Sequence, residues 1–182
     1  MYRDNLKNIK GQAWSGGTTK EIYRDREDFD IRISSAVIEA GASKFSDYSG
    51  YRRILKVLEK EVVLTRGNER LSLNKKVTFL FDGHEDIHSE NSERVLDFNV
   101  IFREDKTRVS FIEVSEGTSL ITGDNILIFS LEDNSKTKLG EQSVILDKYD
   151  FILLSEEGSK HVELSGNYLI VTWNPTFSLV KD

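Results

Sequence analysis

Hydrophobic and polar residues alternate with a period of two along much of this chain. In FDIRISSAVI, residues 29–38, the apolar residues Phe29, Ile31, Ile33 and Val37 alternate with polar ones. Because successive side chains of a β-strand point to opposite faces, this pattern predicts a strand. Similar runs are present at residues 51–73, where a break and a Gly67–Asn68 turn interrupt the run, and at 77–83, 94–102, 108–114, 119–131, 143–154 and 166–173.

Turn signals separate these runs at roughly the spacing of a β-sandwich or barrel, and no long helical pattern occurs. Two stretches, residues 67–83 and 140–158, share the order glycine, paired strand, charged turn and apolar strand. This internal echo indicates two small barrels or sandwiches in one all-β chain. We expect the seam in the charged stretch 103–108, which gives halves 1–103 and 104–182 of a single compact unit.

The composition of the 182 residues argues against several classes of protein. Hydrophobic residues make up 38% and charged residues 31%, a balance typical of soluble globular proteins. The net charge of -6 disfavours nonspecific attraction to nucleic acid. The absence of cysteine excludes disulfides and thiolate metal sites. We see neither a signal peptide nor an apolar run that could span a bilayer, so we expect a cytoplasmic protein with no membrane partner.

The segment WSGGTTKEI, which runs from Trp14 to Ile22, does not have the spacing of a nucleotide-binding loop. A P-loop requires Gly-x4-Gly-Lys-Ser/Thr, the Rossmann spacing also fails, and no helical pattern follows. Two adjacent glycines instead indicate a tight turn, or a bulge that feeds the strand TTKEIY.

The three histidines of the chain do not form a metal-binding motif. His84 and His88 have the i,i+4 spacing of a helical zinc pair, but on a strand residues four apart lie roughly 13 Å from each other. His161 stands apart from both, and no motif supplies further ligands. We therefore expect solvated turn residues here, no metal and no cofactor.

Strand parity separates two neighbouring arginines. Arg53 shares its parity with Tyr51, Leu55 and Val57, whereas the face of Arg52 carries Lys56 as well as Ile54 and Leu58. Arg53 is therefore the better candidate to point inward, and a buried guanidinium needs a carboxylate or an anionic ligand.

Two other polar strand faces can be interpreted in two ways. Arg32 and Ser34 share a small, polar face, and Asp97 and Asn99 share another. The default interpretation is that each face is exposed to solvent. The alternative is that each face lines a cavity in which these groups contact a ligand.

Several of these segments occur in order and together resemble the HutD/Ves family of bicupins. That family shows a tryptophan, a glycine-rich turn and Thr-x-Glu, then Arg-x-Ser, F-S-x-F/L-P-G-x-x-R, F-x-G and D-F-N. The chain departs from the pattern at Ser49, where the family has proline, and at Lys20, where it commonly has arginine. The matching stretches are WSGGTTKEI, DIRISSAVI, SKFSDYSGYRRILKVLE, FLFDG and DFNVIF, within residues 9–102.

The resemblance implies a bicupin fold with a binding cavity in the first half. Arg32 and Arg53 would supply positive charge for a carboxylate ligand, and Glu21, Asp97 or Asn99 would hold these arginines in place. Trp14 would form a wall of the pocket and Ser34 would add a hydroxyl. The ligand-binding residues expected in this way are Trp14, Thr19, Glu21, Arg32, Ser34, Arg53, Asp97 and Asn99.

The resemblance also implies metal-independent binding of a small carboxylate metabolite, such as urocanate or formylated glutamate. The setting would be regulatory, in histidine utilisation or in a stress response. Two alternatives stay open: an isomerase or hydrolase that uses carboxylates of the same cavity, and an interaction protein without a ligand. No catalytic signature stands out in the sequence, so we favour a protein that is not an enzyme. Flat antiparallel edges would suit a homodimer.

Overall fold

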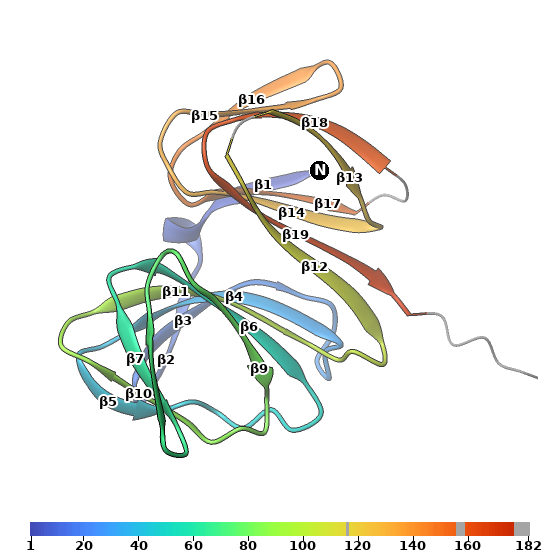
Figure 1. The fold of residues 1–182 in the computed structure, drawn as a ribbon. Helices are drawn as coiled ribbons and strands as arrows, with labels where there is room; N and C mark the ends of the chain where they lie inside the picture. The colour runs from blue at the N-terminus through green and yellow to red at the C-terminus, as the bar shows by residue number, and fades with distance from the viewer. Residues whose placement is uncertain (116, 156–158, 177–182) are drawn as a thin grey trace, which may run out of the picture. The chain divides into compact units, whose positions relative to one another are not determined.

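The structure, a computed structural model, describes residues 1–115, 117–155 and 159–176. Over these ranges it is built from antiparallel strands, with a short 3-10 turn at Leu6–Asn8 (Figure 1). The predicted all-β class is confirmed. Nowhere in these ranges does a helix have the length and apolar character needed to cross a membrane.

The chain divides into two compact units, Ile9–Glu104 and Asp105–Asp182 together with Met1–Asn8. The sequence pattern placed residues 1–8 in the first half, and the structure differs on this point. Strand β1 (Tyr2–Asn5) pairs with β17 (Asp150–Ser155) in the second unit. The short polar segment YRDN has no hydrophobic alternation that could have revealed this pairing. Residues 116, 156–158 and 177–182 of the expected second half lie outside the described residues.

The unit Ile9–Glu104 is made of two antiparallel sheets. Its strands are β2 (Gly11–Trp14), β3 (Gly17–Arg24), β4 (Ile31–Ile38), β5 (Gly41–Lys44), β6 (Arg52–Glu59), β7 (Val62–Arg66), β8 (Glu69–Leu73), β9 (Thr78–Asp82), β10 (Ile87–Asn91) and β11 (Val95–Phe102). The larger sheet has the order β2-β3-β4-β11-β6-β9 and the smaller sheet has the order β5-β10-β7-β8.

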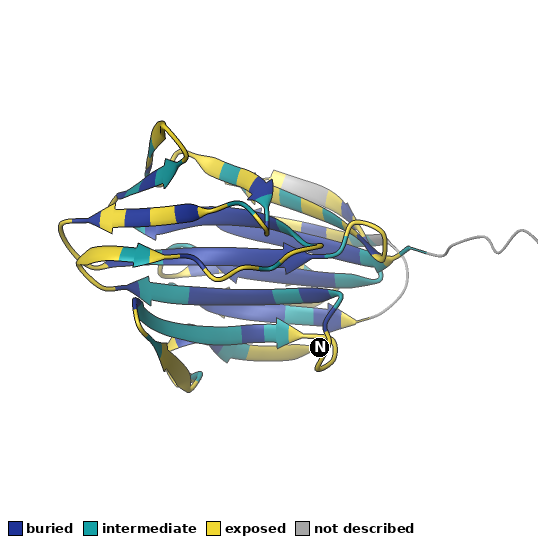
Figure 2. Ribbon diagram, turned by 90° about the horizontal axis from the view of Figure 1, so that it is seen from below, coloured by how far each residue is buried: buried dark blue, intermediate teal, exposed yellow. Residues whose placement is uncertain are grey.

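A hydrophobic core fills the space between these two sheets. Leu55 and Val57 of the larger sheet belong to one buried cluster with Val62 and Leu64 of the smaller sheet. Strand β11 is buried along nearly its whole length, whereas β10 alternates between buried and exposed residues. Figure 2 shows both kinds of strand, some continuously buried and some banded with exposed residues. A two-sheet core is the reason that alternation marks the strands, because each sheet needs an apolar inner face.

The second unit has the same two-sheet plan. Its remaining strands are β12 (Thr107–Val114), β13 (Gly117–Thr122), β14 (Asn125–Ser130), β15 (Ser135–Leu139), β16 (Gln142–Leu146), β18 (Ser159–Ser165) and β19 (Tyr168–Pro175). One sheet has the order β1-β17-β14-β19-β12 and the other has the order β13-β18-β15-β16. Between them, apolar residues such as Ile128, Ile152 and Val162 form a buried cluster.

Strand β10 was not anticipated, because its inward positions are partly polar. Ser89 and Asn91 are buried on this strand, where apolar residues would have produced a clear pattern. Their polar groups are bonded inside the unit: the Ser89 and Ser43 hydroxyls lie 2.7 Å apart, and Asn91 Nδ2 donates to the Glu39 carbonyl at 2.8 Å. Buried polar residues with such partners are tolerated in a core.

Candidate functional site

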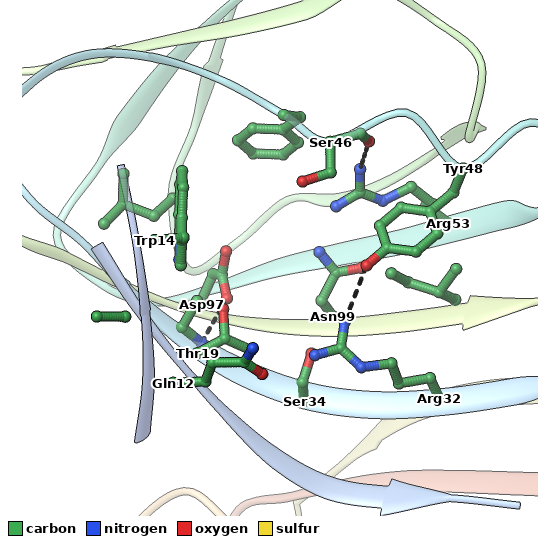
Figure 3. Close-up of a pocket in the computed structure, with 15 residues that line it drawn as sticks. Gln12, Trp14, Thr19, Arg32, Ser34, Ser46, Tyr48, Arg53, Asp97 and Asn99 are labelled. Atoms are coloured by element: carbon green, nitrogen blue, oxygen red, sulfur yellow. Dashed lines mark hydrogen bonds between the residues drawn. The ribbon is translucent and has the colours of Figure 1, made fainter. Parts of the chain in front are cut away.

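A cavity of about 240 Å³ lies in the unit Ile9–Glu104 (Figure 3). One face of the larger sheet forms its floor, and the loop at residues 45–51 and strand β2 contribute further walls. The residues that line it are Gln12, Ala13, Trp14, Thr19, Arg32, Ser34, Ala36, Ile38, Phe45, Ser46, Tyr48, Arg53, Asp97, Asn99 and Ile101.

Strand register brings the polar residues of β4 and β11 together. Ser34 lies opposite Asn99, and Ala36 lies opposite Asp97. Cross-strand partners point to the same face of a sheet, as do residues two apart on one strand, so Arg32 joins this group. The two polar faces that the sequence left open therefore form one continuous cavity floor.

Arg53 is a buried cation held by three aromatic rings. Its Cζ atom lies 5.0 Å from the ring centroid of Phe81, 5.1 Å from that of Phe45 and 5.4 Å from that of Tyr48. Nη1 donates to the Ser46 carbonyl at 3.2 Å, and within the described ranges Nε has no hydrogen-bond partner. The side chain is only 6% exposed.

Burial lowers the pKa of Arg53 to about 10, while the negative charge of Asp97 acts in the opposite direction. The guanidinium is therefore still charged at neutral pH. Among the described residues no carboxylate forms an ion pair with it. The aromatic rings fix its position through cation–π contacts, and they do not neutralise its charge.

Arg32 is the second cation of the cavity, and it is anchored from two directions. Its Nε donates to Glu21 Oε2 at 2.6 Å, and its Nη1 donates to the Tyr48 hydroxyl at 3.3 Å. Glu21 Oε2 also accepts from Arg24 Nη2 at 2.8 Å. Partial burial acts to raise the pKa of Glu21, but the hydrogen bonds from the two arginines hold it below its ordinary value. Glu21 is therefore ionised and orients Arg32, whose guanidinium has five donors in all.

Asp97 is a buried carboxyl group on the same cavity floor. It is 3% exposed, and its Oδ1 accepts a hydrogen bond from the Ala36 N–H at 2.9 Å. Burial raises the pKa of Asp97 to about 7, although the Ala36 hydrogen bond and the charge of Arg53 both act to lower it. Asp97 is consequently poised between its neutral and ionised forms near neutral pH.

The WSGG segment is a hairpin turn at the edge of the cavity. Trp14 pairs with Gly17, so Ser15 and Gly16 form the two-residue turn between β2 and β3. A Cβ atom on Gly16 would lie 2.2 Å from a ring carbon of Trp14, and one on Gly17 would lie 1.9 Å from the Val37 carbonyl oxygen. The two glycines therefore let the indole ring and the neighbouring strand approach the turn closely.

Replacing Gly17 by alanine should destabilise this wall of the cavity. The added methyl group would meet a backbone carbonyl, and the residue has a φ of 156°, which L-residues rarely adopt. We expect a loss of roughly 2–4 kcal/mol in the free energy of unfolding, measured by urea denaturation. Ser15→Ala, in the same turn, is the matched control and should change stability little. Equal unfolding midpoints for the two variants would contradict this account of the turn.

Seven of the eight residues expected at the site line the cavity, and Glu21 does not. Glu21 instead pairs with Arg32 and Arg24, so its place is that of an arginine partner. The seven lining residues are Trp14, Thr19, Arg32, Ser34, Arg53, Asp97 and Asn99.

Tyr48 is a lining residue that the sequence did not single out. Its backbone N–H donates to the Gly83 carbonyl at 2.8 Å, and the Gly83 N–H donates to the Tyr51 carbonyl at 2.7 Å. These bonds dock the loop at residues 45–51, so that the Tyr48 ring reaches Arg53 and its hydroxyl reaches Arg32. The cluster of tyrosines before the motif arginine, in SDYSGYRR, was the available signal.

The histidines do not belong to the cavity. His88 lies on β10 rather than in a turn, is exposed, and has its Nε2 3.3 Å from Asp86 Oδ1. His84 and His161 are also exposed. Within the part of the chain that the structure describes, no three His, Cys, Asp or Glu residues are grouped as they would be around a metal ion.

Comparison with known proteins gives one family and a shared fold. The family model described as HutD matches residues 6–171. HutD from Pseudomonas fluorescens SBW25 (formate condition) is 24% identical, with a TM-score of 0.86 over 97% of this chain and 99% of that chain. A conserved protein of unknown function from Pseudomonas aeruginosa PAO1 is 23% identical, with a TM-score of 0.84 over 97% and 99%.

The wider structural neighbours include a cupin. A cupin 2 conserved barrel domain protein from Leptotrichia buccalis is 9% identical, with a TM-score of 0.66 over 96% of each chain. At such low identity the likeness concerns the fold alone. Among curated proteins, none matches this chain.

Proposed function

This chain belongs to the HutD family and has a cupin-type fold, and we propose that it binds a small carboxylate metabolite in the cavity of the unit Ile9–Glu104, without a metal ion. The observation that carries the proposal is Arg53, a buried guanidinium with no carboxylate paired to it among the described residues. An unpaired buried charge is costly, and an anionic ligand would offset that cost. Arg32, fixed by Glu21, supplies a second set of donors in the same cavity.

The size and lining of the cavity favour a small ligand. Its volume of about 240 Å³ is below the roughly 300–1,000 Å³ of sites for drug-sized molecules. Ile38, Phe45 and Ile101 provide apolar wall next to the charged groups. This combination suits a compact carboxylate with a short apolar or planar body. Urocanate and formylglutamate are the first candidates because the family resemblance implies them, and a regulatory role in histidine utilisation or stress belongs to the same proposal.

A thermal-shift series tests the proposal. A carboxylate that binds the folded state at 100 times its dissociation constant stabilises it by about 2.7 kcal/mol, which raises Tm by several degrees. We expect such a rise with urocanate or formylglutamate, and a much smaller one with the corresponding uncharged amides. Equal shifts for acid and amide, or no shift with any carboxylate, would contradict the proposal.

Arg32→Gln should weaken carboxylate binding by roughly 10- to 100-fold, because one charge-assisted contact is worth about 1.5–3 kcal/mol. Affinity can be measured by calorimetric titration with the carboxylate that gives the largest thermal shift. Arg52→Gln is the matched control: Arg52 Nε lies 3.2 Å from Asp82 Oδ1, and the residue does not line the cavity. Equal losses of affinity in both variants would show that the effect is one of overall charge.

An enzymatic role is the second candidate, and Asp97 is the observation that favours it. A carboxyl group with a pKa of about 7 in a cavity has the property of a general acid or base. Incubating the protein with each stabilising carboxylate, and following the ligand by NMR, separates the two roles. Conversion that scales with protein concentration and is lost in Asp97→Asn would indicate catalysis, whereas an unchanged ligand supports a binding protein.

A further inference from the structure

Asp97 shares a small cavity with the two cations that would hold an anion. In Figure 3, Arg32 and Arg53 lie on one side of the cavity, and Asp97 lies toward Trp14 on the other. Arg53 reaches it from β6 and Arg32 from β4, and Tyr48 lines the cavity from the loop at residues 45–51.

Among the residues that the structure describes, no other charged group lines the cavity. The hairpin β2–β3 contributes Gln12, Trp14 and Thr19, which are uncharged, and Glu21 of β3 is paired with Arg32. Asp97 is therefore the acidic group that a bound anion would face.

We propose that this site binds its anion together with one proton, and that Asp97 is the residue that carries the proton. The inference rests on the proposed binding of a carboxylate, and it adds that the protein takes up a proton when the anion binds. The charges balance as follows: a ligand carboxylate, the Asp97 carboxylate and one proton give the bound ligand anion and a neutral Asp97 carboxyl group.

Electrostatic repulsion between a bound anion and ionised Asp97 favours uptake of the proton. A sphere of the cavity's volume, about 240 Å³, would be about 8 Å across, and we take about 8 Å as the separation between a bound carboxylate and Asp97. At this separation and an effective dielectric constant of about 20, the added negative charge favours the protonated form of Asp97 by roughly tenfold or more. The ligand would also take over the interaction with Arg53, the cation that favours ionised Asp97 in the free protein.

The hydrogen-bonding capacity of the carboxyl group also favours its protonated form. Ionised Asp97 can only accept hydrogen bonds, and its Oδ1 already accepts from the Ala36 N–H. Protonated Asp97 gains an O–H donor while keeping an acceptor for Ala36. Binding an anion therefore converts a repelling group into a neutral one that can donate a hydrogen bond.

Little free energy is needed to protonate Asp97. Burial already raises the pKa of Asp97 to about 7, so the free protein holds this proton part of the time at neutral pH. A further increase on binding keeps the group protonated across the physiological range. The affinity for an anion should then be greatest below about pH 7 and should fall above it.

Formate is a suitable probe, because it stays ionised over the whole range of the measurement. We expect its affinity, measured by calorimetric titration, to be roughly tenfold or more weaker at pH 8.5 than at pH 6. Titrations in two buffers of different ionisation enthalpy should show uptake of a large fraction of one proton per formate bound near pH 7.5. In Asp97→Asn, which resembles the neutral acid, both the pH dependence and the proton uptake should disappear.

Asp82→Asn is the control variant. Asp82 is a half-exposed carboxylate of β9 that pairs with Arg52 and does not line the cavity. It should keep the wild-type pH dependence.

The possible results distinguish proton coupling, the role of Asp97 and carboxylate binding itself. Formate binding with no pH dependence and no proton uptake in the wild-type protein would overturn proton coupling and leave carboxylate binding intact. Proton uptake that persists in Asp97→Asn would assign the proton to another group and overturn the role of Asp97. An absence of formate binding at every pH would overturn this inference, and the failure of urocanate and formylglutamate as well would overturn the proposed function.

Discussion

Arg53→Met is expected to lower the affinity for a carboxylate ligand by about 100-fold or more. The substitution removes the buried cation, and the loss of two charge-assisted hydrogen bonds corresponds to at least about 3 kcal/mol. Methionine should still pack among Phe45, Tyr48 and Phe81, because a thioether makes favourable contacts with aromatic rings. Calorimetric titration with the wild-type ligand measures the effect.

The fold of this variant should persist, which separates the loss of binding from unfolding. Replacing a buried charge by an apolar side chain of similar volume is often neutral or stabilising. We therefore expect the free energy of unfolding of Arg53→Met to equal or exceed that of the wild type in the absence of ligand. Arg52→Met, on the adjacent residue outside the cavity, should retain binding. Wild-type affinity in Arg53→Met would remove the main support for an anion site.

Asp97→Asn is expected to change how stability depends on pH. The pKa of Asp97 is about 7 in the folded protein against a model value of 3.8, so the folded state binds the proton more tightly than the unfolded state does. The resulting contribution to the free energy of unfolding is fully present below about pH 4 and is lost as pH rises through about 7. The three-unit difference corresponds to as much as about 4 kcal/mol.

Urea denaturation of the two proteins between pH 5 and pH 8 measures this contribution. The wild type should lose roughly 2–3 kcal/mol relative to Asp97→Asn across the interval, because asparagine does not titrate. Asp82→Asn should instead follow the wild type, since Asp82 is not a buried carboxyl. Parallel curves for the wild type and Asp97→Asn would show that Asp97 is ionised in the folded protein throughout this range.

The hydrophobic pattern predicted the strands that are rich in apolar residues and missed several others, including β18, in which Val162 and Leu164 are buried. Runs such as residues 29–38 and 94–102 correspond to β4 and β11. Strand β10 was not predicted because its inward residues Ser89 and Asn91 are polar. Strand β1 was not predicted because its pairing partner is far away in the sequence. In both cases the strand is stabilised by partners that a local window of sequence does not contain.

Part of the site could also be predicted from the sequence. Parity alone favoured an inward Arg53, because Leu55 and Val57 share its face. For Arg32, strand parity favoured a solvent-exposed side chain, and only the resemblance to the family motifs indicated that it lines a cavity. Glu21 was expected among the ligand-binding residues, as a group that holds an arginine in place; it does pair with Arg32 and Arg24, but it does not line the cavity.

The sequence by itself determined the all-β class, most strands, the family and seven residues that line the cavity. The tertiary structure decided which faces of β4 and β11 enclose the cavity, because both strands are largely buried and alternation does not distinguish one buried face from the other. It also decided the place of Tyr48, whose loop is docked by backbone bonds to Gly83. Above all, it decided the state of Asp97: a carboxyl group acquires a pKa near 7 only through burial beside particular neighbours, and those neighbours are assembled by the fold.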